Sequence, residues 1–477
     1  MKRQFPVRQG ILQREAKGVL IMKNKRIVSL LMSAAMSASL LCACGGSATS
    51  TAAGESTTES GSGSSSSETI TLKMWGGVPA ENGPQAACDA FNEAYKDKGI
   101  QVEYERFVND DTGNVKLETN LMGGSEIDLY MSYTMSQLTK RAEGNMALDL
   151  SDLCARDNFD LTQYLGDLVN SYNVDGKPYA LPCKLDQYGM VLNKDMFDAA
   201  GIEIPSEWTY DEFLENCKKL THGDGADKVY GVYWNSQQDM MQYAQFMISQ
   251  TLGGDNMYAD GGKATNFTDP VWEKTIDLIN TTMNEGYAPT HADSVTEKLS
   301  QESMFLGEKS AMTIGPWMIR NIKDTATYPH TFVTAFAPYP VIEKGQRNYT
   351  QGGYGDFLCI NPRSEHIDAA WEFAKWYLTE GAIHLASGGR VPSANTFDTD
   401  KVTEAFLSGA ENLFDAESLK HVLIEPHDNY AAPTITTKNA ELSDICNQEL
   451  EAIYTGKESA ADGLAKAKEN GDAALAG

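Results

Sequence analysis

The sequence predicts an α/β fold in which strands and helices alternate along the chain. Residues 69–75, 100–104 and 127–131 are predicted strands, because apolar side chains alternate with polar ones or form a short apolar run. Between them, residues 87–95 carry apolar side chains at helical spacing, and a second helix is predicted near 114–122. Strand, helix, strand, helix, strand in this order is typical of an α/β domain.

The same alternation continues toward the C-terminus. Further strands are predicted at 229–233, 310–314, 331–337 and 354–360, an extended segment at 179–191, helices at 271–284 and 367–379, and a helical C-terminal third. Another helix begins after Thr209, which forms a capping box with Glu212, while Trp208 and Phe213 occupy the hydrophobic staple positions. We therefore expect Trp208 to be structural rather than a ligand contact.

The N-terminal residues read as a targeting segment, not as part of a folded domain. Met22 opens a short basic stretch, and residues 27–41 form a mostly apolar run that is short for a membrane span. Leu41-Cys42-Ala43-Cys44 resembles a bacterial lipobox, which implies cleavage after Ala43 and a diacylglycerol on Cys44; the alternative is an ordinary signal with an incidental cysteine. We expect a signal peptide over 1–43, with the true start at Met22, and a disordered Ser/Gly/Thr linker over 44–68.

Charge and cysteine content restrict the possible partners. The net charge is −27, and loss of residues 1–43, with eight basic residues and one acidic residue, would lower it to about −34. Such a charge argues against binding to nucleic acid and against general adhesion to anionic lipids. Six cysteines follow Cys44 without a CxxC pair or metal-type spacing to the seven histidines, so we expect mostly free thiols, no metal and no cofactor, although disulfides are possible in an exported protein.

Several aromatic residues stand at the ends of predicted strands. Trp75, Trp234 and Trp317 each directly follow a predicted strand, and Tyr133 follows another by two residues. Open α/β sheets bind ligands in the crevice beyond the carboxyl ends of their strands. A single tryptophan is more often part of the core, but three at equivalent strand ends favour a ligand site.

The chemistry of these residues points to a sugar. Aromatic faces stack on the apolar face of a sugar ring, and polar side chains bind its hydroxyl groups. Asp186 lies in a polar cluster inside an otherwise apolar extended segment, where a charge needs a partner or a ligand. An ion pair with Lys184 on one face of a strand explains this residue equally well, and the sequence leaves both interpretations open.

The order and spacing of loose motifs add a family resemblance. The motifs are Asp175-Gly176-Lys177-Pro178-Tyr179-Ala180-Leu181-Pro182, then Gly189, Asn193-Lys194, Phe197, Gly201, Pro205 and Trp208, then Phe305, Gly307-Glu308-Lys309-Ser310-Ala311-Met312 and Gly315-Pro316-Trp317, and finally Gly352-Gly353, Ala369-Ala370-Trp371-Glu372-Phe373 and Pro392. With these motifs the chain resembles the extracellular solute-binding proteins of carbohydrate ABC transporters, in the maltose- and multiple-sugar-binding group.

This resemblance implies a two-lobed, periplasmic-binding-protein-like α/β fold of type II, with the ligand cleft between the lobes. It implies crossings near 181–186, 335–338 and 393–397. The corresponding parts are 69–184 and 335–394 for the first lobe, and 185–334 and 395–477 for the second.

The resemblance also implies a set of ligand contacts. Trp317 matches a stacking tryptophan, Asp186 an acidic hydroxyl contact, Ser132 and Tyr133 the loop after the third strand, Gly353 and Tyr354 a glycine-pair segment, and Arg390 is a weaker match. With Trp75, Lys184 and Trp234 these residues complete the predicted site. An acidic residue frequent in the family after the position of Tyr133 is replaced here by Met135 and Ser136, so the sugar itself is not predicted.

The predicted function is that of a monomeric, lipid-anchored receptor on the outer face of the cell membrane. It would deliver a sugar or oligosaccharide to the permease subunits of an ABC transporter by closing its lobes, without chemistry on the ligand. The alternatives are the same fold binding a polyamine, peptide, metal or other small solute, or a surface glycosidase. The GxSxG, HExxH, GxxxxGK[ST] and GxGxxG motifs are absent, which argues against common hydrolases, proteases and nucleotide enzymes.

Overall fold

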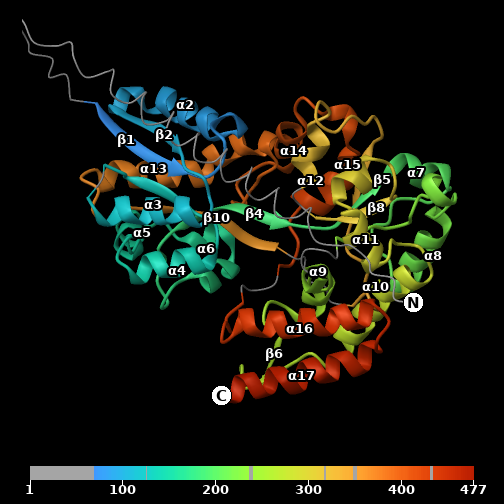
Figure 1. Cartoon of the computed structure of the whole chain (residues 1–477). Helices are drawn as coiled ribbons and strands as arrows, with labels where there is room; N and C mark the ends of the chain where they lie inside the picture. The colour runs from blue at the N-terminus through green and yellow to red at the C-terminus, as the bar shows by residue number, and fades with distance from the viewer. Residues whose placement is uncertain (1–68, 125, 236–239, 316–317, 347–351, 430–432) are drawn as a thin grey trace, which may run out of the picture. The chain divides into compact units, whose positions relative to one another are not determined.

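The computed structural model describes residues 69–477 apart from 125, 236–239, 316–317, 347–351 and 430–432, and residues 67–477 form one compact unit (Figure 1). The expected signal peptide, the linker, Cys44 and Trp317 lie outside the described residues. Within the described ranges, no helix combines the length and the apolar character needed to cross a bilayer.

The first lobe is built on a six-stranded sheet with strand order β11-β4-β10-β3-β1-β2. β1 runs parallel to β2 and β3, whereas β10 is antiparallel to both β3 and β4. The elements of this lobe are β1 (Ile70–Gly76), η1 (Ala80–Asn82), α2 (Pro84–Tyr95), η2 (Lys96–Lys98), β2 (Ile100–Arg106), α3 (Asp111–Met122), β3 (Leu129–Ser132), α4 (Met135–Glu143), α5 (Ser151–Asp157), α6 (Leu161–Leu165), η3 (Asp167–Tyr172), β4 (Leu181–Gln187), β10 (Gly352–Ile360), α13 (Ile367–Thr379), η6 (Gly381–Gly388) and β11 (Val391–Pro392).

Two hydrophobic clusters cover the two faces of this sheet. Leu358 of β10 packs in one cluster with Phe91 of α2 and Trp371 of α13. Its neighbour Phe357 packs in the other cluster, which includes Leu117 of α3. Successive strand residues point to opposite faces, so β10 is buried on both sides and its apolar run is explained.

The second lobe is built on a small antiparallel sheet with order β8-β5-β9 and a two-stranded ribbon, β6-β7. Its helices α16 and α17 lie side by side at the C-terminus (Figure 1). The elements are β5 (Met190–Asn193), α7 (Lys194–Ala199), α8 (Tyr210–Leu220), η4 (Gly225–Asp227), α9 (Met240–Leu252), β6 (Tyr258–Ala259), β7 (Ala264–Thr265), α10 (Pro270–Asn284), α11 (His291–Glu297), η5 (Glu302–Leu306), β8 (Met312–Ile314), α12 (Met318–Lys323), β9 (Thr334–Ala337), α14 (Thr399–Leu407), η7 (Glu411–Leu413), α15 (Ala416–Leu419), η8 (Lys420–Ile424), α16 (Asn439–Tyr454) and α17 (Ala460–Ala476).

Local sequence signals set several of these elements. The capping box of Thr209 and Glu212 begins α8, and Trp208 packs edge-on against Phe213 with ring centroids 5.2 Å apart. Trp208 is buried and donates its indole N–H to the Pro338 carbonyl (2.7 Å), so its structural role is confirmed. The predicted helix at 367–379 is confirmed as α13 with the same bounds.

One strand prediction is wrong. Residues 229–233 make only isolated bridges, from Val229 to His222, from Tyr230 to Ser310 and from Tyr233 to Thr313. The N–H of Tyr230 donates to the Lys309 carbonyl (2.9 Å), but that of Val232 donates to the Tyr287 carbonyl (3.2 Å). Because every second N–H of a strand faces the same neighbour, the diversion of the Val232 donor interrupts the ladder.

The predicted second crossing between the lobes also needs correction. β9 pairs with β5 in the small sheet, so residues 335–337 belong to the second lobe. The chain is still in that lobe at Val341, whose N–H donates to the Trp208 carbonyl (2.9 Å), and it joins the large sheet only at Gly352. The first lobe therefore resumes after Val341 instead of at 335.

Candidate ligand-binding site

Tyr133 stands at the carboxyl edge of the large sheet. It directly follows β3, and its hydroxyl accepts a hydrogen bond of 2.5 Å from the N–H of Gly77, the residue after β1. Because β1 and β3 are neighbouring parallel strands, their carboxyl ends meet at this edge, where open sheets bind ligands. Tyr133 is half-buried, and burial raises the pKa of its phenol well above the ordinary range.

Trp75 belongs to the core of the first lobe. The expectation that it follows a strand is wrong, because β1 continues to Gly76. Its side chain is buried in the cluster of Phe107 and Tyr130, and the Lys116 ammonium lies 5.1 Å from its ring centroid. The ring is therefore packed against protein instead of facing open space.

Trp234 is likewise buried, in the core of the second lobe. Only 2% of its surface is exposed, its indole N–H donates to the Thr282 hydroxyl (2.9 Å), and its ring lies 5.9 Å from that of Phe213. These contacts leave no ring face for a ligand. Of the three tryptophans predicted at strand ends, two are thus placed in cores, and Trp317 lies outside the described residues.

Lys184 and Asp186 form an ion pair on strand β4. Residues two apart on a strand point to the same face, which brings the two side chains together. The ion pair that the sequence allowed as an alternative is therefore present. About a fifth of each side chain stays exposed, so both groups keep capacity for further hydrogen bonds.

Opposite Asp186, strand β10 begins with a glycine pair. Gly353 faces Asp186 in the ladder and has φ of 107°, a value that L side chains rarely adopt. A Cβ on Gly353 would lie 2.1 Å from the Tyr172 hydroxyl, which accepts a hydrogen bond of 2.9 Å from the Tyr354 N–H. The glycine thus permits β10 to pack closely against η3.

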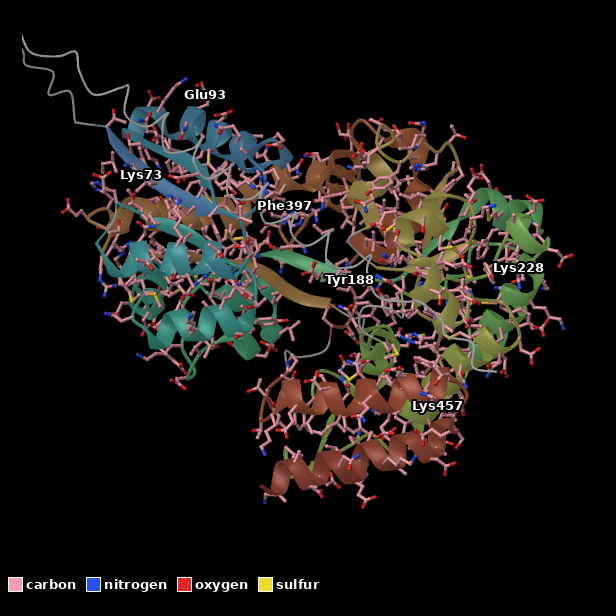
Figure 2. All side chains as sticks on the ribbon, in the orientation of Figure 1. Lys73, Glu93, Tyr188, Lys228, Phe397 and Lys457 are labelled. Atoms are coloured by element: carbon pink, nitrogen blue, oxygen red, sulfur yellow. The ribbon has the colours of Figure 1, made fainter. Side chains whose placement is uncertain are left out.

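Tyr354 itself points into the protein. Its hydroxyl donates to the Leu165 carbonyl, its ring lies 5.4 Å from that of Tyr172, and burial raises its pKa to about 12. It also lines a cavity of about 510 Å³ together with Leu185, Pro392 and Phe397, the last labelled in Figure 2. This cavity borders the crossing strands and continues toward His427, which also lines a second cavity of about 330 Å³.

Arg390 pairs with Asp356, a residue that sequence reasoning missed. The Arg390 Nε donates to Asp356 Oδ2 (2.7 Å), and the Asp356 side chain is only 8% exposed. The signal was available, because Asp356 is a charged residue inside the apolar run 354–360, the same argument that singled out Asp186. Arg390 also lies close enough to Tyr133 to influence the pKa of its phenol.

Ser132 is fully buried in β3. Its hydroxyl accepts a hydrogen bond of 2.8 Å from Arg141 and lies 3.6 Å from the Cys359 sulfur. Arg141 is the second candidate that the sequence did not reveal, because two of its partners, Glu118 and Asn114, lie 23 and 27 residues away in the chain. Ser132 therefore contacts protein groups in the position predicted for a ligand contact.

The described residues show no group of three His, Cys, Asp or Glu side chains arranged to hold a metal ion. All six cysteines after Cys44 are free thiols; five are buried, and Cys154 is partly exposed. Burial raises the pKa of the Cys88 thiol to about 12, as expected of a cysteine that serves as a small core residue.

Comparison with known families decides the identity of the fold. Residues 79–383, more than half of the chain, match the family model described as bacterial extracellular solute-binding protein. The chain belongs to this family. The match begins after β1 and ends within η6, so it includes β4 with its Lys184–Asp186 ion pair, whereas Arg390 and β11 lie beyond it.

Relatives of this solute-binding protein carry names of sugar-binding proteins. A maltotriose-binding protein of Pyrococcus abyssi is 30% identical over 44% of this chain and 42% of its own length. A diacetylchitobiose-binding protein of Streptomyces coelicolor is 28% identical over 50% of this chain and 54% of its own length. The chain thus spans about half of the length of these relatives.

Solved structures confirm the predicted two-lobed fold of the solute-binding protein. A sugar transporter protein of Rhizobium etli in an open conformation matches with a TM-score of 0.68 and 24% identity. The match covers 85% of this chain and 99% of that chain. The predicted architecture is therefore confirmed for the greater part of the chain.

Proposed function

We propose that this solute-binding protein binds a sugar or oligosaccharide outside the cell and delivers it to the permease of an ABC transporter. Family membership supports a binding protein, and the names of the two relatives support a carbohydrate ligand. We further propose that Cys44 carries the lipid that holds the protein at the outer face of the membrane, with residues 44–68 as its tether.

The observation that carries the choice of ligand is the charge balance along the crossing strands. Asp186 is paired with Lys184, and Asp356 is paired with Arg390. A polyamine would need unpaired carboxylates to balance its own positive charges. A neutral hydroxyl group can instead accept a hydrogen bond from the lysine or arginine of an existing ion pair, or donate one to its aspartate. Two neutralised pairs beside the site thus favour a polyol over a cation.

The proposed contacts follow from this arrangement. Tyr133 and Trp317 would stack on sugar rings, while Asp186, Lys184 and Arg390 would bind hydroxyl groups. Gly353 would bring the backbone of β10 close to the ligand. We leave Trp75, Ser132, Trp234 and Tyr354 out of the direct contacts, because their side chains are engaged inside the lobes.

Lobe closure would couple binding to transport. We propose that the lobes are joined by β4 with Tyr188–Gly189, by the chain between Val341 and Gly352, and by the chain after Pro392. A ligand that contacts both lobes favours the closed arrangement by its difference in affinity between the two states. Closure would bring surfaces of both lobes together for the permease, and no reaction on the sugar is needed.

The decisive experiment is thermal unfolding of the purified protein with a panel of mono- and oligosaccharides, with spermidine and short peptides as controls. A ligand at about 100 times its dissociation constant adds roughly 2.7 kcal/mol of stability and raises the melting temperature. A shift with one class of sugar supports the proposal and identifies the ligand. A shift with spermidine alone would replace the sugar by a polyamine, and release of smaller sugars from an oligosaccharide would indicate a glycosidase.

A further inference from the structure

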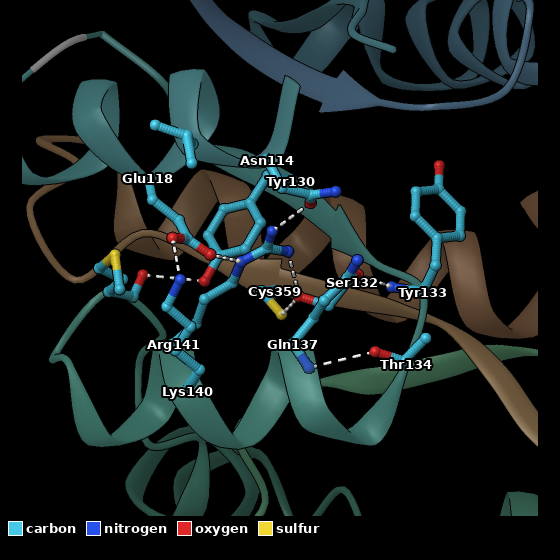
Figure 3. A network of polar contacts seen from close by, with 12 residues as sticks. Asn114, Glu118, Tyr130, Ser132, Tyr133, Thr134, Gln137, Lys140, Arg141 and Cys359 are labelled. Carbon is cyan, nitrogen blue, oxygen red and sulfur yellow. Dashed lines mark hydrogen bonds and ion pairs between the residues drawn. The ribbon is translucent and has the colours of Figure 1, made fainter. Parts of the chain in front are cut away.

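Arg141 of α4 is fully buried and joins three elements behind the carboxyl edge of the large sheet (Figure 3). Its Nη1 donates to the Ser132 hydroxyl (2.8 Å) and to the Met131 carbonyl (3.3 Å), both on β3. Its Nη2 donates to Asn114 Oδ1 (2.6 Å) and its Nε to Glu118 (3.4 Å), both on α3. The guanidinium therefore fixes the end of β3 relative to α3 and α4.

Fold stability alone does not explain a charge at this position. Burying a guanidinium and the nearly buried carboxylate of Glu118 has a desolvation cost that their attraction often fails to exceed. Apolar residues of similar volume are frequently as stable or more stable in such places. A planar group with five donors does, however, set geometry, because it satisfies several acceptors in fixed directions at once.

Arg141 sets the geometry of the β3–α4 loop, which consists of Tyr133 and Thr134 and is called the Tyr133 loop below. Tyr133 is the residue directly after Ser132, and its N–H donates to Gln137 Oε1 (2.8 Å). The N–H of Gln137 in turn donates to the hydroxyl of Thr134, the N-cap of α4 (3.1 Å). Arg141 thus fixes the residue before the loop, Ser132, and Gln137 binds the backbone of the loop itself. The Tyr133 ring points away from this network (Figure 3).

We propose that Arg141 and Gln137 are positioning residues that hold the β3–α4 loop in its ligand-ready shape, so that Tyr133 pays little ordering entropy on binding. Neither residue touches the ligand. The inference rests on the proposed function, because it assigns to Tyr133 the role of a stacking residue for a sugar. Preorganisation of this kind raises affinity by reducing the entropy lost when a side chain is immobilised.

The neighbouring Lys140 provides a matched control. Its ammonium bonds the same Glu118 (2.6 Å), but within the described contacts it reaches neither β3 nor the Tyr133 loop. Arg141→Met and Arg141→Lys should each weaken binding of the sugar identified for the wild type by about three- to tenfold. Lys retains the charge but not the fork geometry, and Lys140→Met should leave the affinity unchanged.

A second pair of variants covers the case in which Arg141→Met fails to fold. Gln137 lies near the surface, so Gln137→Ala removes the acceptor of the Tyr133 N–H without burying a charge. Gln137→Glu keeps an acceptor oxygen in that place, now from a carboxylate, and should retain both affinity and loop order. A purely structural role would give no such rescue.

Two measurements on the full-length protein decide the inference: sugar affinity by calorimetry, and hydrogen exchange of the Tyr133 amide without ligand. We expect faster exchange and weaker binding for Gln137→Ala, and wild-type values for Gln137→Glu and Lys140→Met. Wild-type affinity and exchange in Gln137→Ala would overturn the inference. If the wild type binds no sugar, the proposed function fails, and unchanged exchange in Gln137→Ala would still overturn the positioning role by itself.

Discussion

Replacing Gly353 by alanine tests the packing of β10 against η3. At φ of 107° an alanine is strained by about 1–3 kcal/mol. Its Cβ would also lie 2.1 Å from the Tyr172 hydroxyl, which must move and give up the N–H of Tyr354. A buried donor left without a partner costs about 1–3 kcal/mol. The expected loss of about 2–6 kcal/mol is a large share of the 5–15 kcal/mol typical of folded domains.

Urea unfolding, followed by tryptophan fluorescence, measures this loss. Gly355→Ala is the matched control on the same strand, because Gly355 is not among the residues with positive φ. Its Cβ would meet only the side chain of Asp186, at 3.0 Å. We expect this control to cost less than about 1 kcal/mol, because Gly355 needs no unusual φ and the partly exposed Asp186 side chain can move away from the new Cβ.

A double-mutant cycle separates the overlap from the backbone strain. Tyr172→Phe removes the hydroxyl that the new Cβ would strike, and leaves the Tyr354 N–H without its partner in advance. In that background Gly353→Ala should cost only the backbone strain, which gives a coupling energy of about 1–3 kcal/mol. Costs of the two substitutions that simply add, within about 0.5 kcal/mol, would refute the reasoning.

Three further predictions concern the ligand, the membrane and pH. Trp317→Ala should weaken sugar binding by about 1–3 kcal/mol through loss of a stacking surface, and a well-folded variant with wild-type affinity by calorimetry would remove Trp317 from the site. Cys44→Ser should move the protein from the membrane fraction to the soluble fraction of cells; continued sedimentation with membranes would contradict the lipid anchor. Burial lowers the pKa of Lys323 to about 8, below the 10.5 of a free lysine, so the unfolded chain binds more protons between these values. Stability should therefore rise with pH between about 8 and 10 relative to Lys323→Met, whereas parallel pH profiles in chemical unfolding would count against this burial effect.

Local signals in the sequence predicted those structural elements that depend on residues close together in the chain. The cap of α8 and the bounds of α13 follow from residues within a turn or two, and both are observed. The prediction of an α/β fold rests on the same kind of periodicity. Residues 229–233 show the limit of this reasoning, because Val232 directs its N–H to the carbonyl of Tyr287, far along the chain, and no strand pattern encodes that choice.

The candidate site was harder to predict because it depends on pairing between distant segments. Trp75 lies near the end of β1, and Trp234 follows a segment that was only predicted to be a strand. Neighbouring helices cover both rings, and the sequence contains no sign of which segment end stays open. The pair of Arg390 and Asp356 joins residues 34 apart, and Arg141 meets Asn114 from 27 residues away. Asp186 was found because a charge in an apolar strand needs a partner wherever that partner lies.

The position of the proposed contacts matters for how binding would act on the lobes. Lys184, Asp186 and Gly353 lie on β4 and β10, the strands that adjoin the crossings, whereas Tyr133 lies on one lobe only. A ligand moves a conformational equilibrium only by the difference in its affinity for the two states. If the lobes close as proposed, contacts next to the crossings would change their surroundings, so they could supply that difference. Tyr133 would move as a unit with its lobe, held there by the network of Arg141 and Gln137. Its share of the binding energy would therefore favour occupancy, whereas the contacts next to the crossings would determine how far occupancy closes the lobes.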